Sequence, residues 1–300
     1  MAGTITTGNH PKSLWPGIHA WFGMQYNEHP EEYSAIFDVE KSSKNYEEDV
    51  LGTGFGLAPI KTEGGSVSYD SENQGYTKRY THTAFGLGYI VTREEMDDNL
   101  YEIVSKRRSK RLAFSMRQTK EIVHALVLDR AANSSYTGGD AKELLATDHP
   151  TMSGNQSNEL ATAADFSEAA LEDIIIQIGQ AKNERGMRIS LRPRKLIHPV
   201  NIQFDVSRVL KSELTPDSAN NAVNAVRLVG LKPVLNHYVT DTDQWFVQTD
   251  CPNGLQTFER VGVEFTKDND FDTDNAKAKA YMRFSQGWTD WRCVYGSPGA

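Results

Sequence analysis

The strongest periodic signal in the sequence is a helix that begins at Thr92. Thr92 and Glu95 have the spacing of a capping box, in which each side chain hydrogen-bonds a free backbone N–H of the first turn. No glycine or proline occurs between Tyr89 and Thr137, and helix-forming residues dominate to about residue 131. This pattern predicts one helix of about forty residues, whereas helices of globular proteins usually have about 8–20. A sustained heptad of apolar residues is lacking, so the pattern does not favour a coiled coil.

Two segments before this helix lack an apolar core of their own. Residues 51–91 are divided by glycines, and the run YTKRYTHTAFGLGYIV (76–91) alternates and is rich in Thr and Tyr, which favours strands. With a turn at Gly64–Gly65, the segment predicts a long protruding ribbon, and an isolated ribbon is only marginally stable in water. Residues 1–45 are polar, with scattered aromatic residues and no clear period. They predict an extended arm that becomes ordered on another surface.

Helices and strands alternate in the rest of the chain. Residues 167–186 predict an amphipathic helix with Ser167 as its N-cap and Gly186 at its end. A strand, a second helix and a strand–turn–strand unit follow at residues 187–199, 201–213 and 231–250. Two further strands, at residues 261–268 and 277–288, are joined by the acidic loop NDFDTDN. This order of elements predicts an α+β protein.

The composition is that of a globular chain rather than a general polyanion binder. Of its 300 residues, 38% are hydrophobic and 24% are charged, and the formal net charge is −8. A general polyanion binder would instead carry a broad excess of Lys and Arg to neutralise phosphates. The two cysteines, Cys251 and Cys293, are isolated in the sequence, as is typical of a reducing compartment. We expect neither a signal peptide nor a membrane span, because no segment approaches about 20 apolar residues.

No segment carries a convincing catalytic, cofactor or metal motif. The glycines of GTGFGLA (52–58) lack the Lys-Ser/Thr pair of a phosphate-binding P-loop. The run DNDFDTDNAKAK, from Asp268, has alternate acids like a calcium loop, but Thr273 replaces the required glycine and Lys279 replaces the bidentate glutamate. It predicts a solvated turn, with an adventitious cation site as the alternative. Because HExxH and GxSxG motifs are also lacking, we expect no enzyme activity, no catalytic residue, no cofactor and no metal.

Positive charge is concentrated on one part of the long helix. Residues 105–120 hold seven basic side chains and no acidic one. At about 100° per residue, six of them follow a broad stripe along the helix: Lys106, Arg107, Lys110, Arg111, Arg117 and Lys120. Residues 241–275 hold nine acids against two bases, and the candidate acidic partners among them are Asp268, Asp270, Asp272 and Asp274. The basic cluster is a solvated face, a contact with carboxylates of the same or a neighbouring subunit, or a contact with nucleic acid.

Several stretches resemble one protein family and follow its order along the chain. They are KELLATDHP (142–150), LIHPVNIQFDVSRVL (196–210), DTDQWFVQTD (241–250) and FSQGWTDWRCVYGSPGA (284–300). With the arm, the ribbon and the long helix, they resemble the major capsid proteins of tailed bacteriophages, which share the HK97-like fold. The resemblance in sequence runs from about residue 80 to residue 300, and the residues before it match by character only.

The resemblance implies a division of the chain and a function. Residues 1–45 would be the N-terminal arm, 46–91 the E-loop, 92–139 the spine helix of the peripheral domain, 140–258 the axial domain, and 259–300 the closing strands of the peripheral domain. The implied function is the major capsid protein of a tailed double-stranded DNA phage. Such a protein self-assembles through pentamers and hexamers into the icosahedral shell that encloses the genome.

The resemblance also implies partners and a location. The partners would be other copies of the chain, a separate scaffolding protein, a portal, and decoration or cement proteins. DNA would be enclosed without sequence-specific binding, no membrane would be involved, and the protein would reside in the virion after assembly in the host bacterial cytoplasm. In such a shell we expect the basic cluster to bind mainly carboxylates, with DNA as its secondary partner. Lys61 and Lys78 lie in the ribbon, but no motif marks a covalent cross-link.

Two other classes of protein are alternatives to the phage capsid interpretation. An encapsulin-like nanocompartment shell shares the architecture but encloses cargo proteins, so the contents of the particle separate it from a phage head. A soluble α/β enzyme would instead be a small oligomer with a substrate pocket, so the size of the purified assembly separates it from both shells.

Overall fold

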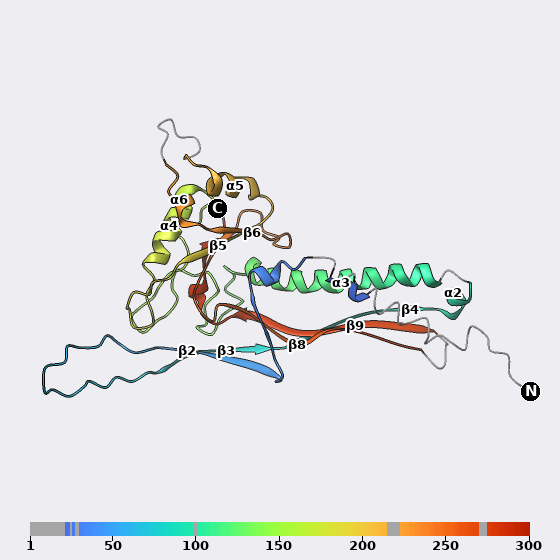
Figure 1. Ribbon diagram of the computed structural model, residues 1–300, viewed down its shortest axis with the longest axis horizontal. Helices are drawn as coiled ribbons and strands as arrows, with labels where there is room; N and C mark the ends of the chain where they lie inside the picture. Colours follow the sequence, from blue (N-terminus) through green and yellow to red (C-terminus); the bar gives the residue numbers. More distant parts are fainter. Residues whose placement is uncertain (1–21, 25, 28–29, 99–100, 215–222, 270–274) are drawn as a thin grey trace, which may run out of the picture.

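The computed structural model describes residues 22–24, 26–27, 30–98, 101–214, 223–269 and 275–300. Figure 1 shows three parts: a long tongue in which a helix lies along a sheet, a more compact body above one end of the tongue, and a two-stranded ribbon that extends beyond the body. The tongue and the body each combine segments that are far apart in the sequence, whereas the ribbon is one continuous hairpin. The mixture of helices and sheets confirms the predicted α+β class.

The tongue is built on a four-stranded sheet. In pairing order its strands are β1 (Asp38–Lys41), β8 (Leu255–Asn269), β9 (Ala276–Trp288) and β4 (Thr83–Val91). β1 runs parallel to β8, whereas the β8–β9 and β9–β4 pairs are antiparallel. With 15 and 13 residues, β8 and β9 are much longer than the average strand of about 5–6 residues. They contain the two strands predicted at 261–268 and 277–288, and their length gives the tongue its elongated form.

The long helix of the tongue is shorter than the sequence predicts. Two helices, α2 (Arg93–Asp97) and α3 (Tyr101–Asp129), replace the predicted single helix of about forty residues. The Thr92 half of the predicted capping box is confirmed, because the Thr92 hydroxyl accepts a hydrogen bond from the Glu95 N–H at 3.4 Å. The Glu95 carboxylate instead binds the guanidinium of Arg108. α2 ends at its C-cap Asp98, whose backbone N–H donates to the Glu94 carbonyl at 3.0 Å.

Small side chains let α3 lie close to the sheet. Alternate residues of β9 are buried and contact one side of α3 through Leu112, Ala113 and Met116. The β9 residues that belong to this core are Ala276, Ala278, Ala280, Met282 and Phe284. The first three are alanines, so the N-terminal half of the strand leaves room for the helix, and the larger side chains fill the space further along. This alternation is the period of a strand with one buried face.

The body contains a second four-stranded sheet with three helices around it. In pairing order its strands are β10 (Val294–Ser297), β7 (Trp245–Thr249), β5 (Pro193–His198) and β6 (Lys232–Leu235). The helices are α4 (Glu168–Gly179), α5 (Gln203–Lys211) and α6 (Val226–Val229). All five residues of β7 are buried, as expected for a central strand that is covered on both faces. Among the described residues, no helix combines the length and apolar character of a membrane span.

The predicted end of the helix over 167–186 is wrong. Ser167 is its N-cap, since the Ser167 hydroxyl accepts a hydrogen bond from the Ala170 N–H at 3.2 Å, but α4 ends at Gly179. Gly186 lies in the following turn with φ of 82°. The side-chain oxygen of Asn183 accepts hydrogen bonds from backbone N–H groups of this turn. Asn side chains compete in this way with the hydrogen bonds of a helix, and here the turn is favoured.

The ribbon pairs β2 (Tyr46–Gly52) with β3 (Gln74–Thr81) in antiparallel fashion. The loop at its end turns at the predicted pair Gly64–Gly65, where Gly64 has φ of 76° and the Gly65 N–H bonds the carbonyl of Thr62. The predicted second strand is divided at His82. Residues before His82 belong to the ribbon, whereas β4 after it pairs with β9 in the tongue. The ribbon is therefore attached directly to the edge of the tongue.

Candidate assembly surfaces

The basic run of α3 is divided between a buried and an exposed side of the helix. The side chains of Arg117 and Lys120 are only 3% and 4% exposed. Arg107, Lys110 and Arg111 are exposed to solvent. The side chain of Lys106 lies outside the described part of the chain. The six residues of the predicted stripe therefore do not form one continuous surface.

The buried half of the run binds carboxylates of the same subunit. Arg117 Nη1 is 2.6 Å from Glu31 Oε1, and Lys120 Nζ is 2.6 Å from Glu259 Oε1. Glu259 belongs to the acidic region 241–275, but Glu31 comes from the aperiodic arm, where no sequence signal marked it as a partner. Of the four candidate acidic partners, Asp268 is exposed on β8, and the other three (Asp270, Asp272 and Asp274) lie outside the described residues.

A second group of contacts fixes the arm to α3. Glu121, which is 1% exposed, accepts hydrogen bonds from the backbone N–H groups of Glu32 at 3.2 Å and Tyr33 at 2.9 Å. These N–H groups lie at the start of the short helix η2 (Tyr33–Ala35). Burial raises the pKa of Glu121, and the N–H groups and Arg117 oppose that effect. Glu32 in turn accepts hydrogen bonds from His237 of the body, so the arm joins α3 to the body.

His124 lies at the centre of this junction. Tyr33 and Phe37 of the arm contact its ring at centroid distances of 4.4 and 5.1 Å, and Phe284 of β9 stacks on it at 5.2 Å. Its Nδ1 donates to the Lys120 carbonyl at 2.6 Å, which leaves Nε2 to accept from the Thr257 hydroxyl at 2.8 Å. Burial lowers the pKa of His124 to about 4, because the charged imidazolium would lose its hydration. A neutral imidazole therefore fills the space between the arm, α3 and the sheet.

The base of the ribbon is held by side chains that reach the rest of the subunit. The Tyr76 hydroxyl donates to the Pro150 carbonyl at 2.6 Å. The Lys78 ammonium donates to the Thr137 carbonyl at 2.9 Å and lies 5.1 Å from the ring centre of Trp288. These contacts fix the direction in which the ribbon leaves the tongue.

One ion pair joins the loop of the ribbon to the body. Arg185 Nη1 is 2.5 Å from Asp70 Oδ2, and Arg185 also donates to the Ser71 carbonyl. The pKa of Asp70 is lowered by hydrogen bonds from the N–H groups of Gly56 and Ser71, and then by Arg185. The carboxylate thus links both sides of the loop to the body while remaining half exposed to solvent.

The end of the ribbon exposes apolar side chains to solvent. They are 60–97% exposed and comprise Phe55, Leu57, Ile60, Val67 and Tyr69. Several of them, together with the adjoining backbone, line a hollow of about 540 Å³ within the loop. Contiguous exposed apolar surface of this kind is typical of a site of association. The ribbon therefore has the character of a contact arm for another molecule.

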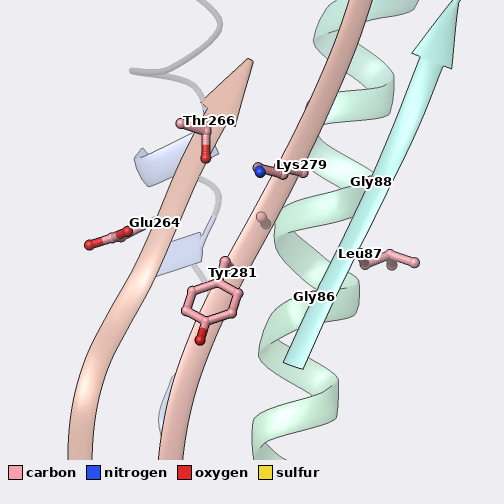
Figure 2. Close-up of a pocket in the computed structure, with 8 residues that line it drawn as sticks. Gly86, Leu87, Gly88, Glu264, Thr266, Lys279 and Tyr281 are labelled. Carbon is pink, nitrogen blue, oxygen red and sulfur yellow. The ribbon is translucent and has the colours of Figure 1, made fainter. Parts of the chain in front are cut away.

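The face of the tongue opposite α3 is also open. Figure 2 shows Glu264, Thr266, Lys279 and Tyr281 on this sheet beside the glycines of β4, with α3 behind the strands. The glycines leave a shallow hollow with a volume of about 380 Å³. A Cβ atom at Gly88 would lie 2.7 Å from the Ala278 carbonyl oxygen, so the close pairing of β4 with β9 requires glycine at this position. Over the described ranges, no group of three or more His, Cys, Asp or Glu residues could hold a metal ion.

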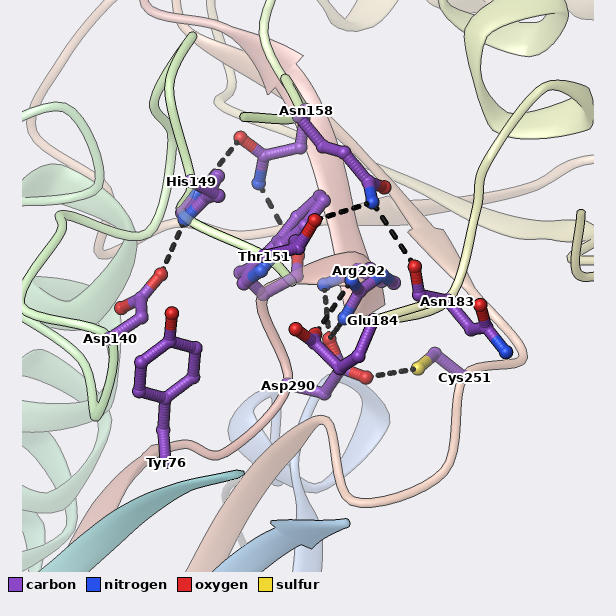
Figure 3. Close-up of polar contacts among 12 residues, drawn as sticks. Tyr76, Asp140, His149, Thr151, Asn158, Asn183, Glu184, Cys251, Asp290 and Arg292 are labelled. Carbon is purple, nitrogen blue, oxygen red and sulfur yellow. Dashed lines mark hydrogen bonds and ion pairs between the residues drawn. The ribbon is translucent and has the colours of Figure 1, made fainter. Parts of the chain in front are cut away.

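A buried charge cluster joins the C-terminal region to the body (Figure 3). The guanidinium of Arg292, 2% exposed, contacts Glu184 at 2.8 Å and Asp290 at 3.2 Å, and its Nε donates to the Lys182 carbonyl at 2.8 Å. The Cys251 thiol lies 3.5 Å from Asp290, and burial raises the pKa of that thiol, which keeps it protonated and unreactive. Because both carboxylates face one buried cation, the cluster is a structural connection.

A second buried network resembles half of a catalytic triad but lacks its nucleophile. His149 Nδ1 is 2.6 Å from Asp140, its Nε2 is 3.1 Å from the Asn158 amide oxygen, and its ring stacks on Trp291 at 4.2 Å (Figure 3). The Asn158 amide nitrogen donates to three backbone carbonyls, those of Leu144, Trp291 and Val294. With both ring nitrogens occupied and the side chain fully buried, His149 has no access to a substrate. The stretches 142–150 and 284–300, which carry the resemblance in sequence, meet here.

Comparison with known proteins agrees with this architecture. A family model described as phage capsid protein matches residues 75–297. Similar solved structures include the capsid of a native GTA particle, with a TM-score of 0.56 and 12% identity over 100% of this chain and 93% of that chain. The capsid of Cyanophage P-SCSP1u has a TM-score of 0.56 and 10% identity over 88% and 86% of the two chains. A virus-like particle from Pyrococcus furiosus has a TM-score of 0.55 and 10% identity over 94% and 98%.

No curated protein sequence matches this chain. The family model covers well over half of the chain, which therefore belongs to the phage capsid protein family. Its fold is HK97-like, as the similarity to capsid structures over nearly the whole chain shows. Family and fold together confirm the predicted major capsid protein of the tailed-phage type, a structural subunit that assembles into an icosahedral virion shell.

Proposed function

We propose that this capsid protein forms the wall of the phage head as both pentamers and hexamers. In this proposal the shell assembles in the host bacterial cytoplasm with a separate scaffolding protein, and a portal and decoration proteins complete it. The observation that carries the proposal is the ribbon, whose apolar end is exposed in the isolated subunit although the rest of the subunit has two packed cores. A subunit of this kind becomes complete only when neighbouring copies cover the ribbon.

The five regions predicted from the resemblance keep their roles in this proposal. The arm (1–45) and the E-loop (46–91) contact neighbours, the spine helix (92–139) and the closing strands (259–300) form the peripheral domain, and residues 140–258 form the axial domain. The two apolar clusters support part of this division, since one contains α4, α5 and the body sheet, and the other lies between α3 and β9. They do not follow its boundaries throughout, because β10, at the end of the closing segment, pairs with β7 in the body sheet, and β4, at the end of the E-loop segment, pairs with β9 in the tongue. The arm contacts within the subunit support a peripheral domain whose position relative to the body is fixed.

The proposed mechanism of assembly is the repetition of a modest contact. Full burial of one large apolar side chain contributes about 1.5–3 kcal/mol, and only part of the ribbon end can be covered at each contact. Ordering the side chains of the loop offsets some of that gain. Each contact is therefore weak, but every subunit makes several contacts at once, and multivalency converts them into a stable shell.

We propose no catalytic role for the chain. The arrangement closest to a catalytic one, His149 with Asp140, is buried and has both ring nitrogens occupied. The Cys251 thiol is held in its protonated form by burial. These features support a purely structural protein, whose work is done by shape and contact area.

An encapsulin-like compartment is the second candidate, because one of the similar structures is a virus-like particle. The two functions differ in what the shell encloses. Purified particles that contain genomic DNA support the phage head, whereas particles that contain only a protein cargo support the compartment.

The experiment that tests the ribbon contact compares two double variants that each replace two exposed apolar residues with serine. Ile60→Ser with Tyr69→Ser removes apolar surface from the ribbon end, whereas Met152→Ser with Ile176→Ser removes exposed apolar side chains from the body. We expect only the ribbon variant to stop at free subunits or capsomers, as measured by sedimentation and electron microscopy, with both variants folded by circular dichroism. Shells from the ribbon variant at wild-type yield would show that the ribbon end is not the assembly contact.

A further inference from the structure

The exposed half of the basic run is a compact cationic patch on α3. Arg107, Lys110 and Arg111 occupy positions i, i+3 and i+4, so their side chains lie on one face of the helix within about one turn. All three are exposed. The next exposed residues on this face, Phe114 and Ile122, are uncharged, which limits the patch to the N-terminal half of the helix.

No carboxylate of the described chain neutralises this patch. Within the described residues, no ion pair of 4.0 Å or less involves any of its three side chains, and the sequence from 103 to 120 contains no acid. The other described cations of the run differ, since Arg108 binds Glu95 and the two buried cations bind their own carboxylates. Like charges at this spacing destabilise a helix. Among the described residues these three cations have no carboxylate within 4.0 Å, so the patch is suited to an external anion.

We infer that Arg107, Lys110 and Arg111 bind the phosphate backbone of the enclosed DNA, and that this face of α3 lines the interior of the shell. The inference rests on the proposed function, which places duplex DNA inside the shell. Arg and Lys are the side chains that contact phosphates without reading sequence. The cations that bind carboxylates in this subunit are held in place by packing, whereas the three of the patch are long, exposed and adaptable. Such side chains suit a backbone whose position differs from one subunit to the next.

The expected affinity per subunit is low. Three phosphate contacts give a slope of about −2.7 for the logarithm of the binding constant against the logarithm of salt concentration. Binding then weakens about 40-fold between about 50 and 200 mM salt. The net charge of −8 opposes tighter binding, so the patch positions DNA against the wall without holding it fast.

The test is a titration of a short fluorescent DNA duplex with unassembled full-length subunits at several salt concentrations. The variant is Arg107→Gln with Lys110→Gln and Arg111→Gln. Its control, Lys182→Gln with Arg188→Gln and Lys232→Gln, removes three exposed cations from the body and changes the net charge equally. We expect the patch variant to lose at least tenfold in affinity at about 50 mM salt and most of the salt slope, and the control to stay within twofold of wild type.

Three results would overturn the inference. The first is that the patch variant binds DNA like wild type, and the second is that the control loses as much affinity as the patch variant. The third is that the folded patch variant fails to form shells while its DNA affinity is unchanged. The last result would assign the patch to carboxylates of a neighbouring subunit. Electron microscopy of wild-type preparations is done in parallel, because failure of wild type to form any shell contradicts the proposed function whatever the titration gives.

Discussion

Replacement of Glu121 by glutamine tests how the arm is attached to the spine helix. In the wild type, the buried Glu121 carboxylate accepts two backbone N–H groups at the start of η2. The glutamine side chain introduced by Glu121→Gln is nearly isosteric, but it has one acceptor oxygen and presents an N–H₂ group where the second acceptor was. One backbone N–H is then left without its partner in a buried site.

The magnitude follows from the two hydrogen bonds. A hydrogen bond to a charged group contributes about 1.5–3 kcal/mol, and a buried donor left unsatisfied costs about 1–3 kcal/mol. The raised pKa of Glu121 shows that burying its charge has a cost, which the neutral amide avoids. We therefore expect the free energy of unfolding to fall by about 2 kcal/mol, which is less than the sum of the lost hydrogen bond and the unsatisfied donor.

The assay is urea unfolding of unassembled subunits, combined with limited proteolysis of the arm. Glu172→Gln, on the exposed side of α4, makes the same chemical change without a buried partner and is expected to shift stability by less than about 0.5 kcal/mol. Proteases should cut residues 30–41 faster in the Glu121 variant. The reasoning is refuted if Glu121→Gln unfolds like the control and its arm is cut at the wild-type rate.

Three further predictions concern other parts of the subunit. Arg292→Leu leaves two buried carboxylates without their cation and should lower the free energy of unfolding by about 3–5 kcal/mol; a urea midpoint close to wild type contradicts this. Because the pKa of His124 is lowered to about 4, the free energy of unfolding should be highest above about pH 6.5 and fall by up to about 3 kcal/mol towards pH 4. His124→Asn should flatten that pH profile, and an unchanged profile means that another group titrates. Asp70→Asn should speed proteolysis of the ribbon loop while leaving global unfolding unchanged, and an unchanged rate of cleavage means that the Arg185 contact does not hold the loop.

Local rules of sequence predicted the starts of elements better than their ends. The caps at Thr92 and Ser167 are confirmed, because a cap depends on side chains within one turn. The observed ends differ from the predicted ones, since α4 stops at Gly179 and the ribbon stops at His82. Both ends are set by partners distant in sequence or by competing turn hydrogen bonds, which periodicity along one segment does not report.

The candidate site shows the same limit. Helical phase placed the basic residues on a stripe of α3, but it did not tell which side of that stripe packs against the arm and the sheet. Arg117 and Lys120 are on the packed side, and their partners are Glu31 and Glu259. Glu31 lies in an aperiodic segment, so its proximity to α3 arises only from the tertiary fold. In the same way, the family stretches indicated the fold, whereas the buried network around His149 became visible only when those stretches met in space.

Electron cryomicroscopy of particles formed by the full-length chain, alone and with its scaffolding protein, tests the central claim most directly. We expect closed icosahedral shells in which the ribbon of each subunit, with its exposed Ile60 and Tyr69, lies against a neighbouring copy. Small monodisperse oligomers that never close into shells under either condition would contradict the assignment of this chain as a shell-forming capsid subunit.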